Sequence, residues 1–171
     1  MWLYYCKCYS DISLLLRRNI CITMIDKTSE ELIAEFPFLK ATEDNPWCYG
    51  NCEGDNWFYE CPEGWQNMFY DLLYAIKPIL EICGGTLQIR QVKEKFGGLR
   101  FYYELFNCDD KATQEIRNLV NYAENLSYKI CLHCGKPVKY RTTGWITYIC
   151  EECANKIGKD KCLLVNDESN D

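Results

Sequence analysis

The stretch VKEKFGGLRFYYE, residues 92–104, places two glycines between a basic segment and a segment of alternating polarity. After the glycines, apolar side chains occupy every second position, which is the period of a strand with one buried face. These apolar positions are Leu99, Phe101, Tyr103 and Leu105. We therefore predict a β-hairpin with strands at residues 86–95 and 99–106 and a turn at the Phe-Gly-Gly sequence between them.

An amphipathic helix is predicted on each side of this hairpin. Before it, apolar residues recur every three or four positions over residues 65–83, and a Gly-Gly pair marks the end of the helix. Pro78 within this pattern predicts a kink or an early break. After the hairpin, Asp109 or Asp110 is expected to cap a helix with one apolar stripe. Two helices that cover one face of a small sheet predict an α+β fold with a helix–β-hairpin–helix core.

Four of the thirteen cysteines form two Cys-x-x-Cys pairs near the C-terminus, fifteen residues apart: Cys131, Cys134, Cys150 and Cys153. This spacing is typical of a four-cysteine zinc site. Gly135 allows the backbone to reverse after the second sulfur, and strands at residues 138–141 and 145–149 are expected to join the two knuckles into a C-terminal zinc ribbon. Four thiolates leave no open position for water, so we predict one structural zinc ion. A redox dithiol is the alternative, but no thioredoxin-like pattern surrounds these cysteines.

The hairpin and the cysteine pairs divide the chain into predicted regions. Residues 24–130 form an α+β domain, residues 131–162 the zinc ribbon and residues 163–171 an acidic disordered tail. Residues 1–23 are expected to be a weakly packed N-terminal extension ahead of a second candidate start at Met24, with a genuine extra strand or helix as the alternative. A capping sequence shortly after Met24 predicts one further helix.

The net charge of −6 is unevenly distributed along the chain. Residues 24–85 carry a local charge of −9, whereas residues 86–106 and 128–162 carry +2 and +4. A basic half can bind a polyanion, although complementarity between the two halves is the simpler explanation. The hydrophobic and aromatic fractions, 48% and 15%, exclude a wholly disordered chain. No apolar run approaches about 18 residues and no secretory signal is recognisable, so we expect a cytoplasmic protein with free thiols and no membrane partner.

No arrangement of catalytic residues is recognisable. His133, the only histidine, lies between two predicted metal ligands and is expected at the surface, which leaves no Ser-His-Asp or Cys-His pair. The hairpin glycines separate two strands and do not open a helix, unlike the glycines of common phosphate-binding motifs. We therefore predict a non-enzymatic protein. The acidic loop at residues 41–64 keeps a metal-assisted hydrolase as an alternative, whereas Cys48, Cys52 and Cys61 lack the fourth ligand of a second metal site.

Several of these segments together resemble a group of small, mostly uncharacterised phage and prophage proteins. These proteins carry a KEKFGGLRFY segment, here residues 93–102, followed by a cysteine knuckle, here residues 131–135. The resemblance covers about residues 59–153 and includes the Cys-Pro-Glu-Gly-Trp sequence at residues 61–65. It implies a phage or mobile-element setting, and hence the cytoplasm of a host cell, but no particular activity.

Three binding functions follow from the sequence. The first is binding of nucleic acid or a nucleic-acid-associated protein through the basic hairpin and ribbon. The second is capture of a nucleotide-type, phosphorylated small ligand at the glycine turn, because a glycine backbone can approach a phosphate closely. The third is a protein–protein adaptor that targets a host factor. The candidate ligand-binding residues are Arg90, Lys93, Lys95, Gly97, Gly98, Arg100 and Tyr102.

Overall fold

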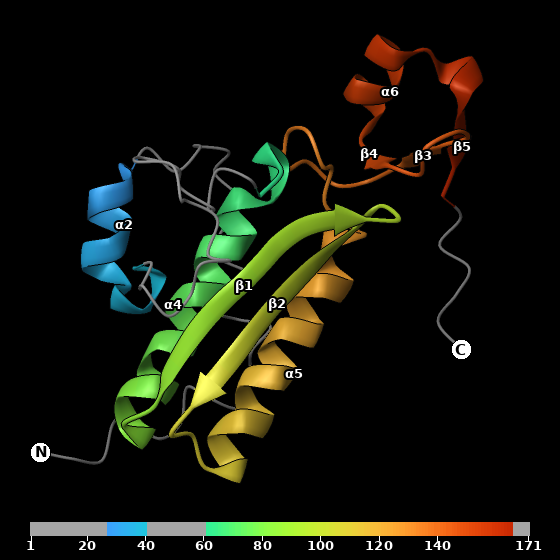
Figure 1. Ribbon diagram of the computed structural model, residues 1–171. Helices are drawn as coiled ribbons and strands as arrows, with labels where there is room; N and C mark the ends of the chain where they lie inside the picture. The colour runs from blue at the N-terminus through green and yellow to red at the C-terminus, as the bar shows by residue number, and fades with distance from the viewer. Residues whose placement is uncertain (1–26, 41–60, 166–171) are drawn as a thin grey trace, which may run out of the picture.

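The protein combines helices with small antiparallel sheets, so the predicted α+β class is confirmed (Figure 1). The computed structural model describes residues 27–40 and 61–165; the predicted extension at 1–23, most of the acidic loop and residues 166–171 of the predicted tail lie outside them. The elements are α2 (Ser29–Glu35), the 3-10 turns η1 (Pro37–Leu39) and η2 (Glu63–Trp65), α4 (Gln66–Cys83), β1 (Thr86–Lys95), β2 (Gly98–Phe106), α5 (Asp110–Ser127), β3 (Tyr140–Thr142), β4 (Tyr148–Ile149), α6 (Glu151–Ile157), η3 (Lys159–Lys161) and β5 (Cys162–Leu164).

Strands β1 and β2 form an antiparallel hairpin with a two-residue turn. Both turn residues, Phe96 and Gly97, have positive φ angles (55° and 79°), as a type I′ turn requires. Positive φ angles place both residues in the left-handed backbone conformation, which costs a residue with a Cβ about 1–2 kcal/mol of free energy. Phe96 is therefore strained and Gly97 is not. The register shifts between Ile89 and Gln91, and this bulge lets both Ile89 and Val92 face the core.

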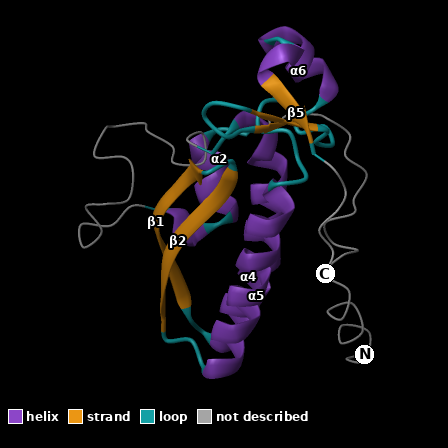
Figure 2. Cartoon of the chain, turned by 90° about the vertical axis from the view of Figure 1, so that its right-hand side faces the viewer, coloured by secondary structure: helices purple, strands orange, loops and turns teal. Residues whose placement is uncertain are grey.

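Helices α4 and α5 pack against each other and against one face of the hairpin (Figure 2). The fully buried side chains at this junction come from both helices and both strands: Phe69, Leu72, Ile76, Leu87, Leu99 and Ile116. Asp109 caps α5, because its Oδ1 accepts a hydrogen bond of 2.7 Å from the backbone N–H of Ala112. Helix α4 continues through Pro78 to Cys83 without the predicted early break.

Helix α2 is attached to the side of α4. Thr28 and Glu31 form a capping box at its N-terminus, as the sequence predicts. Leu32 and Phe36 are fully buried in the main core. The Tyr70 hydroxyl on α4 donates a hydrogen bond of 2.7 Å to Glu35. Within the part of the chain that is described, no helix is long and apolar enough to cross a bilayer.

Side chains of α5 cover the outer edge of β2. The buried Ser127 hydroxyl accepts a hydrogen bond of 2.8 Å from the backbone N–H of Leu99 and donates one of 2.6 Å to the carbonyl of Glu124. The Glu124 carboxylate accepts a hydrogen bond of 2.9 Å from the N–H of Phe101. Two edge N–H groups of a two-stranded sheet are therefore satisfied by helix side chains.

We expect Ser127→Ala to lower the free energy of unfolding by about 1–3 kcal/mol, because the Leu99 N–H would remain buried without an acceptor. Urea unfolding followed by circular dichroism measures this change. Asn125→Ala, at an exposed position of the same helix turn, controls for the better helix propensity of alanine. Equal stabilities of the two variants would contradict a role of Ser127 in holding β2.

Candidate metal centre

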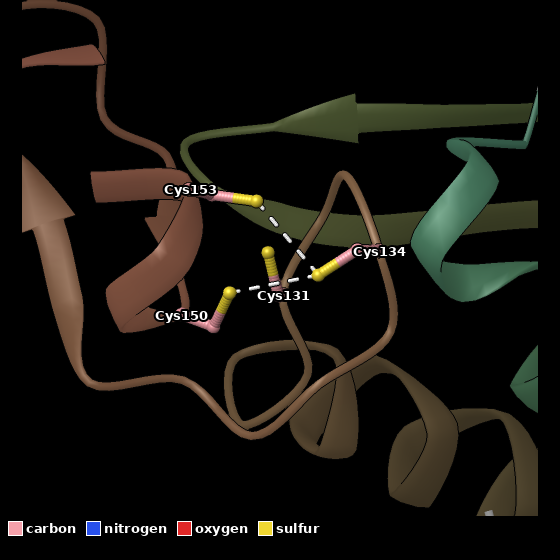
Figure 3. A group of neighbouring side chains, drawn as sticks. All are labelled: Cys131, Cys134, Cys150 and Cys153. Atoms are coloured by element: carbon pink, nitrogen blue, oxygen red, sulfur yellow. Dashed lines mark hydrogen bonds between the residues drawn. The ribbon is translucent and has the colours of Figure 1, made fainter. Parts of the chain in front are cut away.

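Four cysteine thiols converge at the C-terminal end of the described chain (Figure 3). The Sγ atoms of Cys131, Cys134, Cys150 and Cys153 all lie within 4.8 Å of one another. The Sγ of Cys134 is 3.5 Å from that of Cys150 and 3.7 Å from that of Cys153. A tetrahedral ion with zinc–sulfur bonds of about 2.3 Å requires sulfur–sulfur distances of about 3.8 Å, whereas a disulfide bond is about 2.05 Å long. The four thiols could therefore hold a metal ion, and their spacing is not that of disulfides.

The first pair of cysteines lies on a tight knuckle. The N–H of Cys131 bonds to the carbonyl of Lys136 at 2.7 Å, and the N–H of Gly135 bonds to the carbonyl of Cys131 at 2.9 Å. Gly135 has a φ of 73°, which explains the glycine that follows the second cysteine. Three of the four thiols belong to buried residues, while Cys134 is partly exposed.

The second pair differs from the ribbon expected from the sequence. Cys150 is the N-cap residue of α6 and Cys153 lies in the first turn of that helix, so this pair comes from a helix start and not from a second hairpin knuckle. The predicted strands at 138–141 and 145–149 are shorter, as β3 and β4, and β5 adds a third strand beyond them. The sequence analysis missed α6 because seven residues are too few for a periodic apolar pattern.

The thiols influence one another's ionisation. Burial and the neighbouring Cys150 and Cys131 thiols raise the pKa of Cys134, and the pKa of Cys153 is raised by the same kinds of interaction. Burial alone would also raise the pKa of Cys150, but the backbone N–H of Cys153 and the surrounding thiols outweigh it, so that this pKa is lowered. The pKa of one thiol is thus lowered while those of two others are raised. Four thiolates this close together repel one another, so a bound cation is needed before all four can ionise.

The turn before α4 holds the knuckle by hydrogen bonds to the backbone carbonyls of the knuckle. The N–H of Gly64 donates to the carbonyl of Leu132 at 2.9 Å, and the indole N–H of the fully buried Trp65 donates to the carbonyl of Ile130 at 3.0 Å. A Cβ at position 64 would lie 2.0 Å from the carbonyl oxygen of Cys131. The sequence analysis did not assign these two residues to the site, because nothing local links positions almost seventy residues apart.

Acidic residues at the start of α6 neutralise lysines near the metal site. Lys136 forms a salt bridge of 2.5 Å with Glu152. Glu151 accepts from both Lys139, at 2.7 Å, and Lys159, at 2.9 Å, and these lysines lower the pKa of Glu151 to about 2. Three of the seven basic residues at positions 128–162 are therefore paired in these salt bridges.

The candidate ligand-binding residues of the hairpin fall into two groups. The first lies on the face that points away from α4 and α5, where Lys93 is directly opposite Arg100 in the strand pairing. On this face Arg90 forms a salt bridge with Glu104, and the Lys93 ammonium lies 5.2 Å from the centre of the Tyr102 ring. Lys95 ends β1 at the turn, next to Phe96.

The second group, Gly97 and Gly98, is buried beneath tyrosine rings. A Cβ at Gly97 would lie 2.6 Å from the Tyr148 ring, and one at Gly98 would lie 2.3 Å from the Tyr128 ring. The N–H of Gly97 already donates to Glu94 at 2.5 Å. A phosphate at this turn would have to displace that carboxylate, so the two glycines primarily serve close packing of the turn against the C-terminal region.

His133 and Cys61 do not belong to the four-thiol group. His133 is exposed, as expected. Cys61 belongs to the main core, where burial raises its pKa, and Cys48 and Cys52 lie outside the described residues.

Comparison with protein-family models, curated proteins and solved structures finds no match for this chain. Its function must therefore be argued from the site and its surroundings.

Proposed function

We propose that Cys131, Cys134, Cys150 and Cys153 hold one structural zinc ion, and that the protein binds single-stranded nucleic acid without catalysing a reaction. An all-sulfur tetrahedral set favours zinc over the hard cations magnesium and calcium. With four protein ligands no coordination position remains for substrate, which supports a structural role. A phage or prophage setting rests on the sequence resemblance.

The observation that carries the nucleic-acid proposal is the distribution of cations. None of the salt bridges found within residues 27–40 and 61–165 includes Lys93, Lys95 or Arg100. Lys93 and Lys95 lie on the outer face and at the turn of the hairpin. The Arg100 guanidinium donates hydrogen bonds to the Tyr128 hydroxyl, at 2.9 Å, and to the Leu99 carbonyl, at 2.6 Å, but to no carboxylate. Near the metal centre, by contrast, Lys136, Lys139 and Lys159 are paired with Glu151 and Glu152. The hairpin is thus the better phosphate-binding surface, because its charge does not have to be released from carboxylates.

Two exposed aromatic side chains flank the same turn. Phe96 is 66% exposed and Trp145 is 76% exposed. The Trp145 indole N–H donates to Glu94 at 3.2 Å, and the same carboxylate accepts the N–H of Gly97, so Trp145 is held beside the turn. Unpaired bases stack on such side chains, whereas the bases of a duplex are already stacked. The strained backbone at Phe96 is consistent with a position kept for binding.

We expect a labelled single-stranded oligonucleotide to bind with an affinity that falls as salt rises. Removing both charges in Lys93→Ala/Lys95→Ala should lower the slope of log affinity against log salt by about 1.4, since each phosphate contact on a single strand contributes about 0.7. Trp145→Ala should weaken binding about tenfold, the loss of one stacked base. Fluorescence anisotropy at several salt concentrations measures both effects.

The control is Lys77→Ala/Lys111→Ala, which removes the same charge from α4 and α5. An equal loss in both double variants would mean that net charge alone attracts the oligonucleotide. Absence of any salt-dependent binding to DNA or RNA would refute the nucleic-acid proposal and favour a protein partner.

A further inference from the structure

A pair of thiols lies at the end of the hairpin opposite its turn. Cys83 is the last residue of α4, and Cys108 directly precedes Asp109, the N-cap residue of α5. Their Sγ atoms are 3.9 Å apart, and the Cys83 thiol donates toward that of Cys108. Both residues are partly exposed, so small molecules can reach them. Neither belongs to the metal centre.

Gly85 allows the two sulfurs to approach each other. A Cβ at this position would lie 2.5 Å from the Sγ of Cys108 and 3.0 Å from that of Cys83. The φ of Gly85 is not positive, so its backbone conformation does not require glycine. The glycine is needed for space, and the space is filled by both sulfur atoms.

We propose that Cys83 and Cys108 form a reversible disulfide bond that links the end of α4 to the start of α5. The sulfur atoms would have to approach by about 1.9 Å to reach the disulfide length of about 2.05 Å, a movement within the range of side-chain rotation. Burial and the hydrogen bond from Cys83 raise the pKa of Cys108 to about 11, so Cys108 rests as a thiol at neutral pH.

The oxidant is a low-molecular-weight disulfide, and oxidised glutathione is the probe. One cysteine thiolate attacks a glutathione sulfur, which breaks the glutathione disulfide and releases one glutathione. The second cysteine thiolate then attacks the protein sulfur of the mixed disulfide and releases the second glutathione. The protein loses two electrons and two protons, and these electrons and protons end in the two glutathione thiols that are produced.

The bond would close a chain segment that contains the entire β1–β2 hairpin. It would join the two helices that cover the hairpin at their open end, away from the metal centre. A loop of this length should raise the melting temperature by about 5–10 °C, mainly by restricting the unfolded chain. The metal content should not change.

The test uses the full chain with its metal bound. It is incubated with oxidised glutathione, blocked with N-ethylmaleimide, digested and analysed by mass spectrometry. We expect a linked peptide pair that contains Cys83 and Cys108, which dithiothreitol separates, together with the rise in melting temperature. Cys83→Ser should show neither effect. Gly85→Ala should reduce the yield of the linked pair, because the added methyl group separates the sulfurs.

Recovery of Cys83 and Cys108 as separate maleimide or glutathione adducts in the wild-type protein would overturn the proposal. A linked pair that leaves the melting temperature equal to that of identically treated Cys83→Ser would overturn the stabilising role. Loss of metal in parallel with oxidation would show that the oxidant acts on the metal centre and would also count against a separate site.

Discussion

Cys131→Ser is expected to abolish stoichiometric metal binding and to unfold the C-terminal region. The second hydrophobic cluster of the described residues consists of Ile149, Ala154 and three of the four cysteines, so this region has almost no core besides the candidate metal ligands. Structural zinc sites contribute about 10–16 kcal/mol of apparent binding free energy, which small regions of this kind need to fold. Metal content per chain should fall from one to below about 0.1.

Proteolysis reports the structural consequence. In Cys131→Ser, trypsin should cleave after Lys139 and Arg141 at least about a hundredfold faster than in the wild type. Without the metal ion, the C-terminal region unfolds more often and exposes these sites to the protease. Most of the helical circular dichroism should remain, since α4 and α5 belong to the main core. Cys162→Ser is the matched control, because Cys162 packs beside the cluster without belonging to the four thiols. One tightly bound metal ion in Cys131→Ser would contradict the proposed ligand set.

Gly64→Ala is expected to destabilise the protein by about 3 kcal/mol or more, the upper end of the usual cost of overpacking. The added Cβ would lie 2.0 Å from the carbonyl oxygen of Cys131 and 2.6 Å from the nitrogen of Gly135. Both atoms are backbone atoms of the knuckle, so no side-chain rotation can relieve the clash. The turn and the knuckle must separate, which also disturbs the metal ligands.

We therefore expect Gly64→Ala to weaken metal affinity about 10–100-fold, the range found when groups that support metal ligands are removed. Competition with a coloured chelator measures affinity, and urea unfolding measures stability. Gly144→Ala is the control, because a Cβ there meets nothing within 4 Å and its φ is not positive. Wild-type stability and affinity in Gly64→Ala would show that the turn does not support the knuckle.

Local sequence patterns were sufficient for most of the secondary structure. Strand β1 begins and ends at the predicted residues, and β2 begins one residue earlier than expected. Helix α5 begins at the predicted Asp109 cap. These features depend on residues close together in the chain, whose side chains alternate in a strand or recur in a helix. The bulge between Ile89 and Gln91 was not predicted, because it depends on fitting both strands to the helices.

The cysteine spacing likewise identified the four thiols that the fold brings together. It could not show that the second pair lies on a helix, nor that Gly64 and Trp65 support the first. The basic residues near the metal centre appeared equivalent to those of the hairpin in sequence. The pairing of Lys136, Lys139 and Lys159 with Glu151 and Glu152 depends on where α6 places these carboxylates.

The amino-acid sequence by itself determined the α+β class, the hairpin, its flanking helices and the set of four cysteines that cluster, because each is encoded by spacing within a short segment. Only the tertiary structure decided the role of the two turn glycines, which lie beneath Tyr128 and Tyr148. It also decided the contact between Cys83 and Cys108 across the open end of the hairpin. Such contacts join residues distant in sequence, and they form only when burial of the shared core fixes the elements relative to one another.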